Sequence, residues 1–378
     1  WYNSALLISA GATGAFLSDN IISFFAFHEL ALIPTFVMIG LYGRGDRRTT
    51  AWRATLYLGL ASMVLLAALL MIGTQAGFTF SGLKDFMASG RELAHAELIG
   101  ALLIAGFGTL ISLFPFHSWA APAYASAPAP VAMMHAGVLK KFGLYGLFMF
   151  QPLMETGFLP WTNILLVLLV CNVIWVGYVT VNQKRLDLLL GNSSVMHMGY
   201  IFLAFAALVV SGSAEANPWA LKGAALLMLA HGLTIALLFL LCGQIEKQTG
   251  TLEINSLGGL STRLPRMAFV FGLAGMASIG LPGLANFPGE FMVFFSGFAG
   301  FSNGFGPVQI ATILCLWGLV IGAVYMLRAY RNIFQGDLSK ASAYATGLQP
   351  SERAANCFLV IALAVFGFFP TLVLQFFS

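Results

Sequence analysis

Uninterrupted apolar segments, each about as long as a bilayer is thick, dominate this sequence. A membrane-spanning helix needs about 20 apolar residues. Hydrophobic residues make up 59% of the chain and charged residues 8%, against roughly 25% charged in a soluble domain. The apolar runs are continuous rather than alternating, which favours helices over the strands of an outer-membrane barrel. The sequence therefore predicts an all-α polytopic membrane protein and excludes a soluble enzyme. Eleven spans are expected, at 2–18, 21–42, 52–74, 97–114, 131–150, 161–181, 188–211, 218–243, 266–300, 308–330 and 354–377.

Two of these spans contain helix-breaking residues. Irregular backbone at membrane depth is tolerated only where protein or a watery cavity surrounds it. Two broken spans in corresponding halves of a chain point to a transporter with inverted repeats. The ninth span is interrupted by Gly280, Pro282, Gly283 and Pro288, and the fourth runs into Pro115, Pro122, Pro128 and Pro130.

The loops differ in charge, and the difference predicts an orientation. Basic residues collect after the even-numbered second, sixth, eighth and tenth spans. Because cytoplasmic loops carry the excess of Lys and Arg, we expect a cytoplasmic start and a non-cytoplasmic end. The basic loop residues are Arg44, Arg47, Arg48, Arg53, Lys184, Arg185, Lys247, Arg263, Arg266, Arg328, Arg331 and Lys340.

A few titratable residues lie inside the spans, where each charge costs roughly 2.5–3.5 kcal/mol. A rise of about 1.5 Å per residue puts Glu29, Lys141 and His197 roughly 12–15 Å deep, near the middle of a core about 30 Å thick. Titratable groups from different helices at one depth are what a lateral proton path needs. The complete set is Glu29, Lys140, Lys141 and Glu290, with His28, His135, His197 and His231.

Each buried group also has a structural interpretation. For His28 and His135 a packed core histidine is favoured, and for His197 and His231 a proton-relay group is favoured. Lys140 and Lys141 are adjacent and point about 100° apart, so they cannot both face one cavity.

Five stretches of the sequence carry a family resemblance: SDNIISFFAFHELALIP (18–34), PFHSWAAPAYASAPAPVAMMHAGVLKKFGLYGL (115–147), SSVMHMGY (193–200), LAHGLTIALLFLLCGQ (229–244) and GLPGLANFPGEFMVFF (280–295). Together they resemble the antiporter-like membrane subunits of respiratory complex I, and their order and spacing fit subunit M, the chain 4 family, best. The resemblance covers essentially the whole chain. It implies that Trp1 falls near the start of the fourth of fourteen helices, so that an N-terminal segment is missing. It also implies one half-repeat over 1–150 (family helices 4–8), an inverted one over 151–335 (helices 9–13), and a C-terminal loop and last helix over 336–378.

The resemblance assigns roles to single residues. It implies that Glu29 is the acid of the family's fifth helix, that Lys141 is the lysine of the eighth, and that Glu290 is the terminal acid of the broken twelfth. His197 and His231 match the histidines of the central axis. Two further residues stay open as relay members: Lys140, which an alternative alignment through Pro130 and Val131 would choose, and His135.

On the family's seventh helix the chain departs from the family pattern. The family has a lysine on its seventh helix, five residues before the proline of a P-x-H-x-W segment, to pair with the acid of the fifth helix. Here that proline is Pro115, and the position is Leu110. The departure is compatible with a divergent working channel or with a paralogue that no longer pumps.

The resemblance leads us to expect a proton-translocating subunit of an NADH:quinone oxidoreductase, an enzyme only as part of that translocase. Its relay would run from Glu29 through Lys141, His197 and His231 to Glu290, driven by redox chemistry in other subunits. We expect no cofactor or metal in the chain, no nucleic-acid partner, and membrane-arm neighbours and a redox arm as partners in a bacterial inner membrane. The alternatives are a subunit of a multi-subunit cation/proton antiporter or of a membrane-bound hydrogenase, or a non-pumping structural paralogue.

Overall fold

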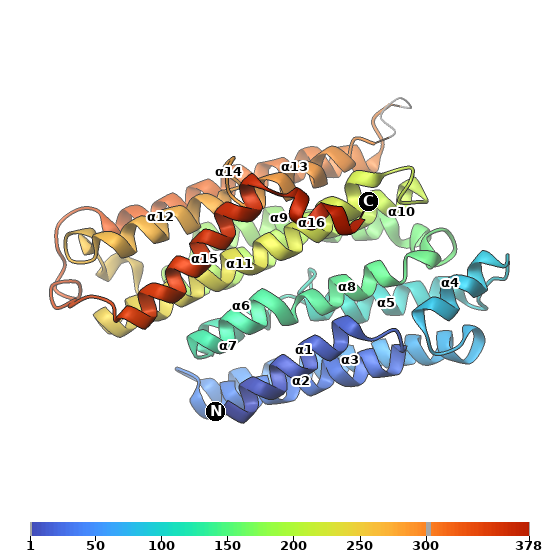
Figure 1. The fold of residues 1–378 in the computed structure, drawn as a ribbon, viewed down its shortest axis with the longest axis horizontal. Helices are drawn as coiled ribbons and strands as arrows, with labels where there is room; N and C mark the ends of the chain where they lie inside the picture. Colours follow the sequence, from blue (N-terminus) through green and yellow to red (C-terminus); the bar gives the residue numbers. More distant parts are fainter. Residues whose placement is uncertain (1, 300–303, 378) are drawn as a thin grey trace.

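The protein is a bundle of long helices (Figure 1), seen in a computed structural model that describes residues 2–299 and 304–377. Within these ranges the only bridges between extended segments are two isolated pairs, Asn20 with Thr79 and Arg185 with Glu253. The all-α class is therefore confirmed. In chain order the helices are α1 (Tyr2–Leu17), α2 (Ile21–Tyr42), α3 (Arg47–Ala76), α4 (Phe80–Ala88), α5 (Ala96–Ile111), α6 (Ala120–Ser126), α7 (Ala129–Met134), the π-helical turn η1 (His135–Leu139), α8 (Lys141–Met149), α9 (Thr162–Val181), α10 (Leu186–Ser211), α11 (Pro218–Thr249), α12 (Pro265–Ile279), α13 (Asn286–Ser296), α14 (Pro307–Phe334), α15 (Pro350–Phe368) and α16 (Thr371–Leu374).

The predicted spans correspond to these helices, with differences at their ends. Seven helical segments of the described chain are long and apolar enough to cross a membrane, and α5 and α12 are shorter apolar helices. Two spans are less regular than expected: 131–150 is divided by η1, and 354–377 ends as a helix at Phe368 before the separate turn α16. Position 300, the expected end of the ninth span, lies outside the described residues, as do positions 1 and 378.

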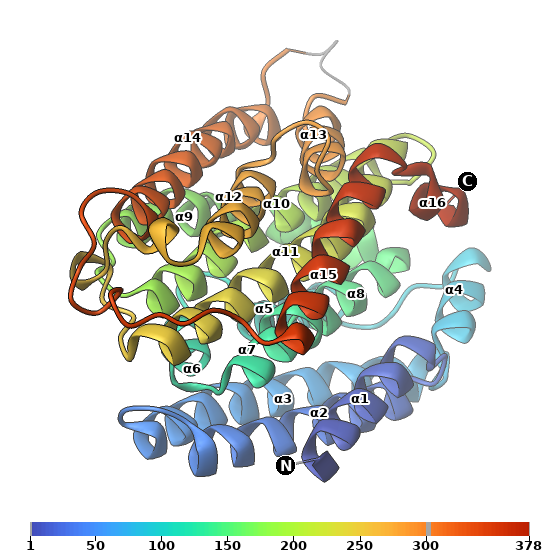
Figure 2. The same ribbon diagram turned by 60° about the vertical axis from the view of Figure 1, so that its left-hand side comes forward.

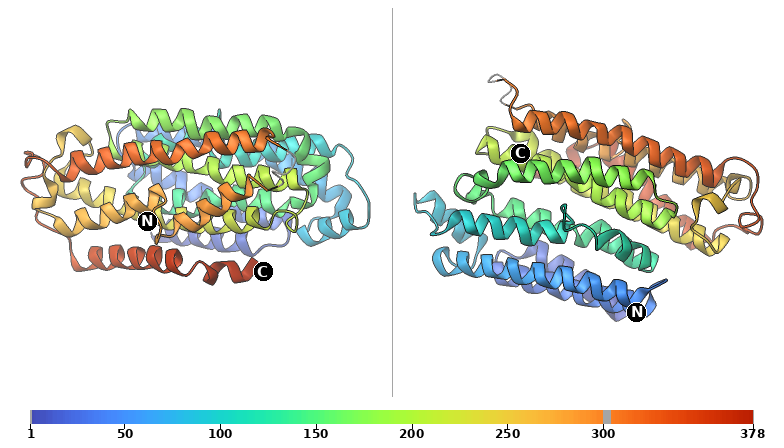
Figure 3. Two further views of the ribbon diagram at one scale, coloured as in Figure 1. Left: turned by 90° about the horizontal axis from the view of Figure 1, so that it is seen from above. Right: turned by 180° about the vertical axis from the view of Figure 1, so that it is seen from behind.

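The helices follow one another across the bundle in chain order. Views from the front and from behind show α1–α3 on one side, then α5–α8, then α9–α11, and α12 and α14 on the far side (Figures 1 and 3). α10 is buried along nearly its whole length. α15 lies on the outside of the bundle (Figures 2 and 3) and buries little of its surface. The expected division between residues 150 and 151 falls just after α8, and the repeat boundaries stay a prediction.

Both predicted helix breaks are present, and the chain passes through them in opposite directions. α5 ends at Ile111, and α6 then runs to Ser126, whose carbonyl accepts a hydrogen bond from the Arg44 N–H. α12 starts among the basic loops and ends at Gly280, which has a left-handed φ of 81°. α13 then continues away from those loops. Pro288 lies inside α13 rather than in the break.

The loops after α2, α9, α11 and α14 meet at one end of the bundle. Arg44 forms an ion pair with Glu246 near the end of α11. Arg328 of α14 donates to the carbonyl of Gln183 in the α9–α10 loop, and the Gly259 N–H donates to Gln335. All four basic loops therefore share one side, as the alternating topology requires.

Candidate functional site

The titratable residues predicted within the spans occupy successive helices. We call Glu29, Lys141, His231, His197 and Glu290 the midplane row. Its members come from α2, α8, α11, α10 and α13, so the row crosses the bundle in the same direction as the succession of helices (Figure 1).

Glu29 lies on the flank of α2 that faces α3. Its Oε1 accepts a hydrogen bond of 2.5 Å from the Ser62 hydroxyl and lies 3.2 Å from Nδ1 of His28. The carboxylate is about one-third exposed, and His28 is buried. Among the described residues, Glu29 forms its ion pair with His28, which belongs to the same helix.

Lys141 follows the π-helical turn and reaches across to α11. Its Nζ donates to the carbonyl of Ala136 at 2.6 Å and lies 2.9 Å from Nδ1 of His231. π-Helical turns inside α-helices frequently occur at functional sites. Lys141 also lines a cavity of about 340 Å³ between α1, α8 and α11.

The adjacent Lys140 points elsewhere. Its Nζ is buried, lies 5.4 Å from the centroid of the Tyr124 ring, and has no hydrogen-bond partner in the described parts of the chain. The two lysines therefore face different surroundings, as their angular separation requires, and Lys141 is the one that contacts a histidine of the row.

His231 and His197 are neighbours, with ring centroids 5.6 Å apart. His197 is held between two carbonyl oxygens, that of Ser193 at 2.7 Å from Nδ1 and that of Ser278 at 2.9 Å from Nε2. Ser278 belongs to the last turn of α12, so His197 connects α10 to the second helix break. The geometry puts His231 next to Lys141 and His197 beyond it, the reverse of the expected order of these two histidines.

Glu290 lies where α13 starts beyond the break. Its side chain is buried, and Oε1 has no hydrogen-bond partner among the described residues. The other oxygen packs over Gly280, where a Cβ atom would collide with it. The carboxyl group also lines a cavity of about 350 Å³ walled mainly by phenylalanines of α13.

A hydrogen bond between α11 and α13 spans the gap from His231 to Glu290. Thr234, one turn after His231, donates its hydroxyl to Oδ1 of Asn286 at 2.8 Å. Asn286 starts α13 and precedes Glu290 by one turn, so the two side chains share a face. Thr234 and Asn286 were not predicted as site residues from the sequence. The sequence feature that points to them is a polar residue one helical turn from a titratable residue of the row.

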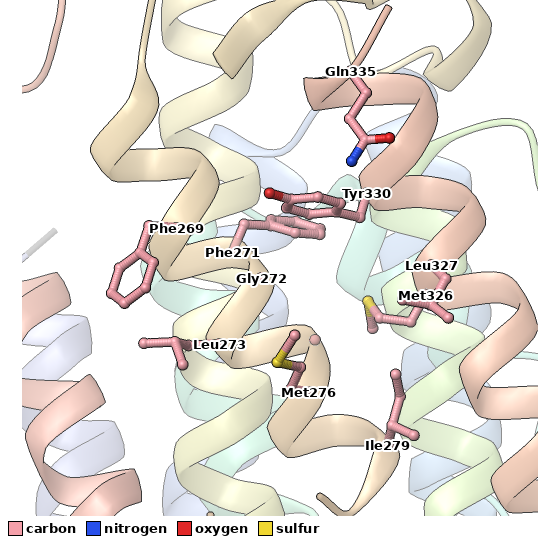
Figure 4. Close-up of a pocket in the computed structure, with 11 residues that line it drawn as sticks. Phe269, Phe271, Gly272, Leu273, Met276, Ile279, Met326, Leu327, Tyr330 and Gln335 are labelled. Carbon is pink, nitrogen blue, oxygen red and sulfur yellow. The ribbon is translucent and has the colours of Figure 1, made fainter.

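Another cavity, of about 320 Å³, lies between α12 and α14 (Figure 4). Apart from Tyr330 and Gln335, the side chains that line it are apolar. No member of the midplane row lines it, so we do not include it in the candidate site.

Buried titratable side chains in contact across helices, beside two discontinuous helices, are features of membrane transport proteins. Residues 18–319 match the family described as "NADH:quinone oxidoreductase/Mrp antiporter, TM", and the chain belongs to this family. It is a multi-pass integral membrane protein.

Proteins named as chain 4 subunits are among those that the chain resembles. The chain is 35% identical over 380 residues to an NAD(P)H-quinone oxidoreductase chain 4 of Synechococcus elongatus, covering 98% of this chain and 68% of that protein. It is 33% identical to a chain 4 of Microcystis aeruginosa, covering 95% of this chain and 64% of the relative. The chain thus spans about two thirds of the length of these relatives.

Solved structures agree on the fold. Respiratory complex I from Thermus thermophilus contains a chain that superposes with a TM-score of 0.89 at 27% identity, covering all of this chain and 77% of that one. A chain of the Mrp complex from Dietzia superposes with a TM-score of 0.83 at 20% identity, covering 99% and 76%. The second likeness shows the fold alone.

Proposed function

We propose that this chain is a proton-translocating subunit in the membrane arm of a bacterial NADH:quinone oxidoreductase. Its partners would be neighbouring antiporter-like subunits and a redox arm that supplies the driving force. The relatives carry the name of such an oxidoreductase and cover the described fold almost from end to end. The chain itself would bind no redox cofactor.

The proposed path is the midplane row. Protons would pass from Glu29 to Lys141, then to His231 and His197, and leave through Glu290. The observation that carries the proposal is the 2.9 Å contact between Lys141 Nζ and His231 Nδ1, with the His197 ring beside it. Two nitrogen bases that approach this closely without a carboxylate between them share a proton more readily than they hold two charges. A proton gained by one therefore favours release from the other.

Neutralising the row tests this function. Lys141→Ala and Glu290→Gln should lower the number of protons moved per NADH oxidised in inverted membrane vesicles, while the chain stays in the assembled complex. Lys84→Ala is the matched control, because Lys84 is exposed on α4 and remote from the row. An unchanged proton-to-electron ratio in both row variants would refute the relay.

A second candidate is a subunit of a cation/proton antiporter, favoured by the same fold in the Mrp complex. Mild-detergent purification of the native assembly separates the two. Co-purifying chains with flavin and iron–sulfur absorbance support the oxidoreductase. An assembly without redox centres supports the antiporter.

A further inference from the structure

The connection between Glu29 and the rest of the row lacks a cation on α5. Position 110 of α5 is a buried leucine. The Glu29 carboxylate contacts the Ser62 hydroxyl and His28. Whatever passes a proton from Glu29 toward Lys141 therefore has to come from helices other than α5.

His28 faces the helix that carries the lysines. Its ring packs edge-on against Phe142, with centroids 5.7 Å apart, and Phe142 directly follows Lys141. α2, which carries His28, also packs against η1, the turn that starts at His135. One side of the His28 ring thus meets Glu29, and the next titratable group on the path inward is His135.

His135 belongs to a cluster of buried polar atoms without partners. Its ring lies 5.6 Å from Trp119 and 5.3 Å from Tyr124, centroid to centroid. His135 Nδ1, the Tyr124 hydroxyl and Lys140 Nζ all lack a hydrogen-bond partner among the residues that the structure describes. Buried polar atoms are nearly always paired in native proteins. Three such atoms converging from α6, η1 and the start of α8 are therefore arranged for exchange with a mobile polar species.

Trp119 connects the residue before position 110 to this cluster. The indole N–H of Trp119 donates to the carbonyl of Thr109 at 3.0 Å, and the Trp119 ring lies beside His135. The residue next to position 110 is therefore in direct contact with a neighbour of His135.

We propose that His28, His135 and Lys140 form a bypass that links Glu29 to the axis in place of a cation at position 110. The inference rests on the proposed function. The Glu29 carboxyl gives a proton to one ring nitrogen of His28, and His28 releases a proton from its other nitrogen toward His135. His135 passes a proton to the neutral amine of Lys140, which returns it to the row. Only protons move, and each group returns to its starting charge.

The test compares four variants in the assembled complex, with protons moved per NADH oxidised as the readout. His135→Phe keeps an aromatic ring between Trp119 and Tyr124 but removes both nitrogens. Lys140→Met keeps the length of the side chain without its charge. Both should lower the ratio to the level of Lys141→Ala. His95→Asn, at an exposed position outside the cluster, should leave the ratio unchanged.

Rescue distinguishes a bypass from a packing role. In the His135→Phe background, Leu110→Lys should restore the ratio at least halfway to the native value, because the added ammonium supplies the missing cation. An unchanged ratio in His135→Phe, or a Leu110→Lys double variant no better than the single one, overturns the bypass. If Lys141→Ala and Glu290→Gln also leave the ratio unchanged, the proposed function itself fails. A loss in Lys141→Ala without one in His135→Phe removes the bypass alone.

Discussion

Single residues in this bundle are placed by backbone groups as much as by other side chains. His197 lies between two carbonyl oxygens from different helices, and Glu290 packs directly on a glycine. A neutral imidazole carries one N–H and donates to one of these carbonyls at a time. The ring therefore needs a second proton to donate to both, which suits a group that alternates between two states.

The contact between Gly280 and Glu290 can be measured by substitution. Gly280→Ala places a methyl group against the Glu290 carboxyl and forces a left-handed residue, which alone costs about 1–2 kcal/mol. Gly250→Ala is the matched control, since Gly250 also ends a helix in the left-handed region but has open space around it. Gly280→Ala should lower both the melting temperature in detergent and the proton-to-electron ratio, and Gly250→Ala only the first. If Gly280→Ala and Gly250→Ala change the proton-to-electron ratio equally, the contact between Gly280 and Glu290 has no role in proton transfer.

Pairs of helices meet where small residues allow it. η1 and α11 cross at Gly137 and Gly232, and a Cβ on Gly232 would lie 2.8 Å from the carbonyl oxygen of Gly137. Close approach through small residues is typical of helix packing in membranes. This crossing brings α11 near enough for His231 to contact Lys141.

A larger residue at the crossing should separate the two groups. Gly232→Leu overpacks the contact at a cost of about 1–3 kcal/mol and should reduce the proton-to-electron ratio to the level of Lys141→Ala. Gly59→Leu, on α3 with no atoms near the added Cβ, should keep both stability and ratio. A native ratio in Gly232→Leu would show that the row tolerates a wider spacing of the two helices.

The whole molecule is asymmetric in charge along the membrane normal. The basic loops are connected at one end through Arg44 with Glu246 and through Lys247 with Glu352. Partly exposed ion pairs of this kind contribute about 0–1 kcal/mol each. Their charge therefore matters more for orientation than for stability.

The orientation gives a prediction for the intact chain. Arg48→Cys, exposed in the first turn of α3, and Lys340→Cys, exposed in the loop after α14, should react with a membrane-impermeant maleimide in inverted vesicles and not in spheroplasts. Glu215→Cys, exposed in the loop after α10, should show the opposite pattern. The unsubstituted chain, with its exposed Cys357, provides the background. The reverse labelling pattern would show that the chain has the opposite orientation in the membrane.

Several features were predictable from the sequence because they depend on free-energy costs that are local along the chain. Apolar length predicted the spans, and glycines and prolines predicted both helix breaks. The cost of burying Glu29, Lys141 and Glu290 singled them out before any fold was known. The expectation that Pro288 breaks the helix was wrong, because a proline in the first turn of a helix lacks only an N–H that has no partner there.

What the tertiary structure decided is which buried groups touch. The rotation of each helix and the spacing set at Gly137 and Gly232 decide these contacts. As a result, Lys141 meets His231 rather than His197, and Lys140 turns toward Tyr124. The link from His28 toward His135 joins residues more than a hundred positions apart. No pattern along one helix contains these distances, because they arise only when several helices pack together.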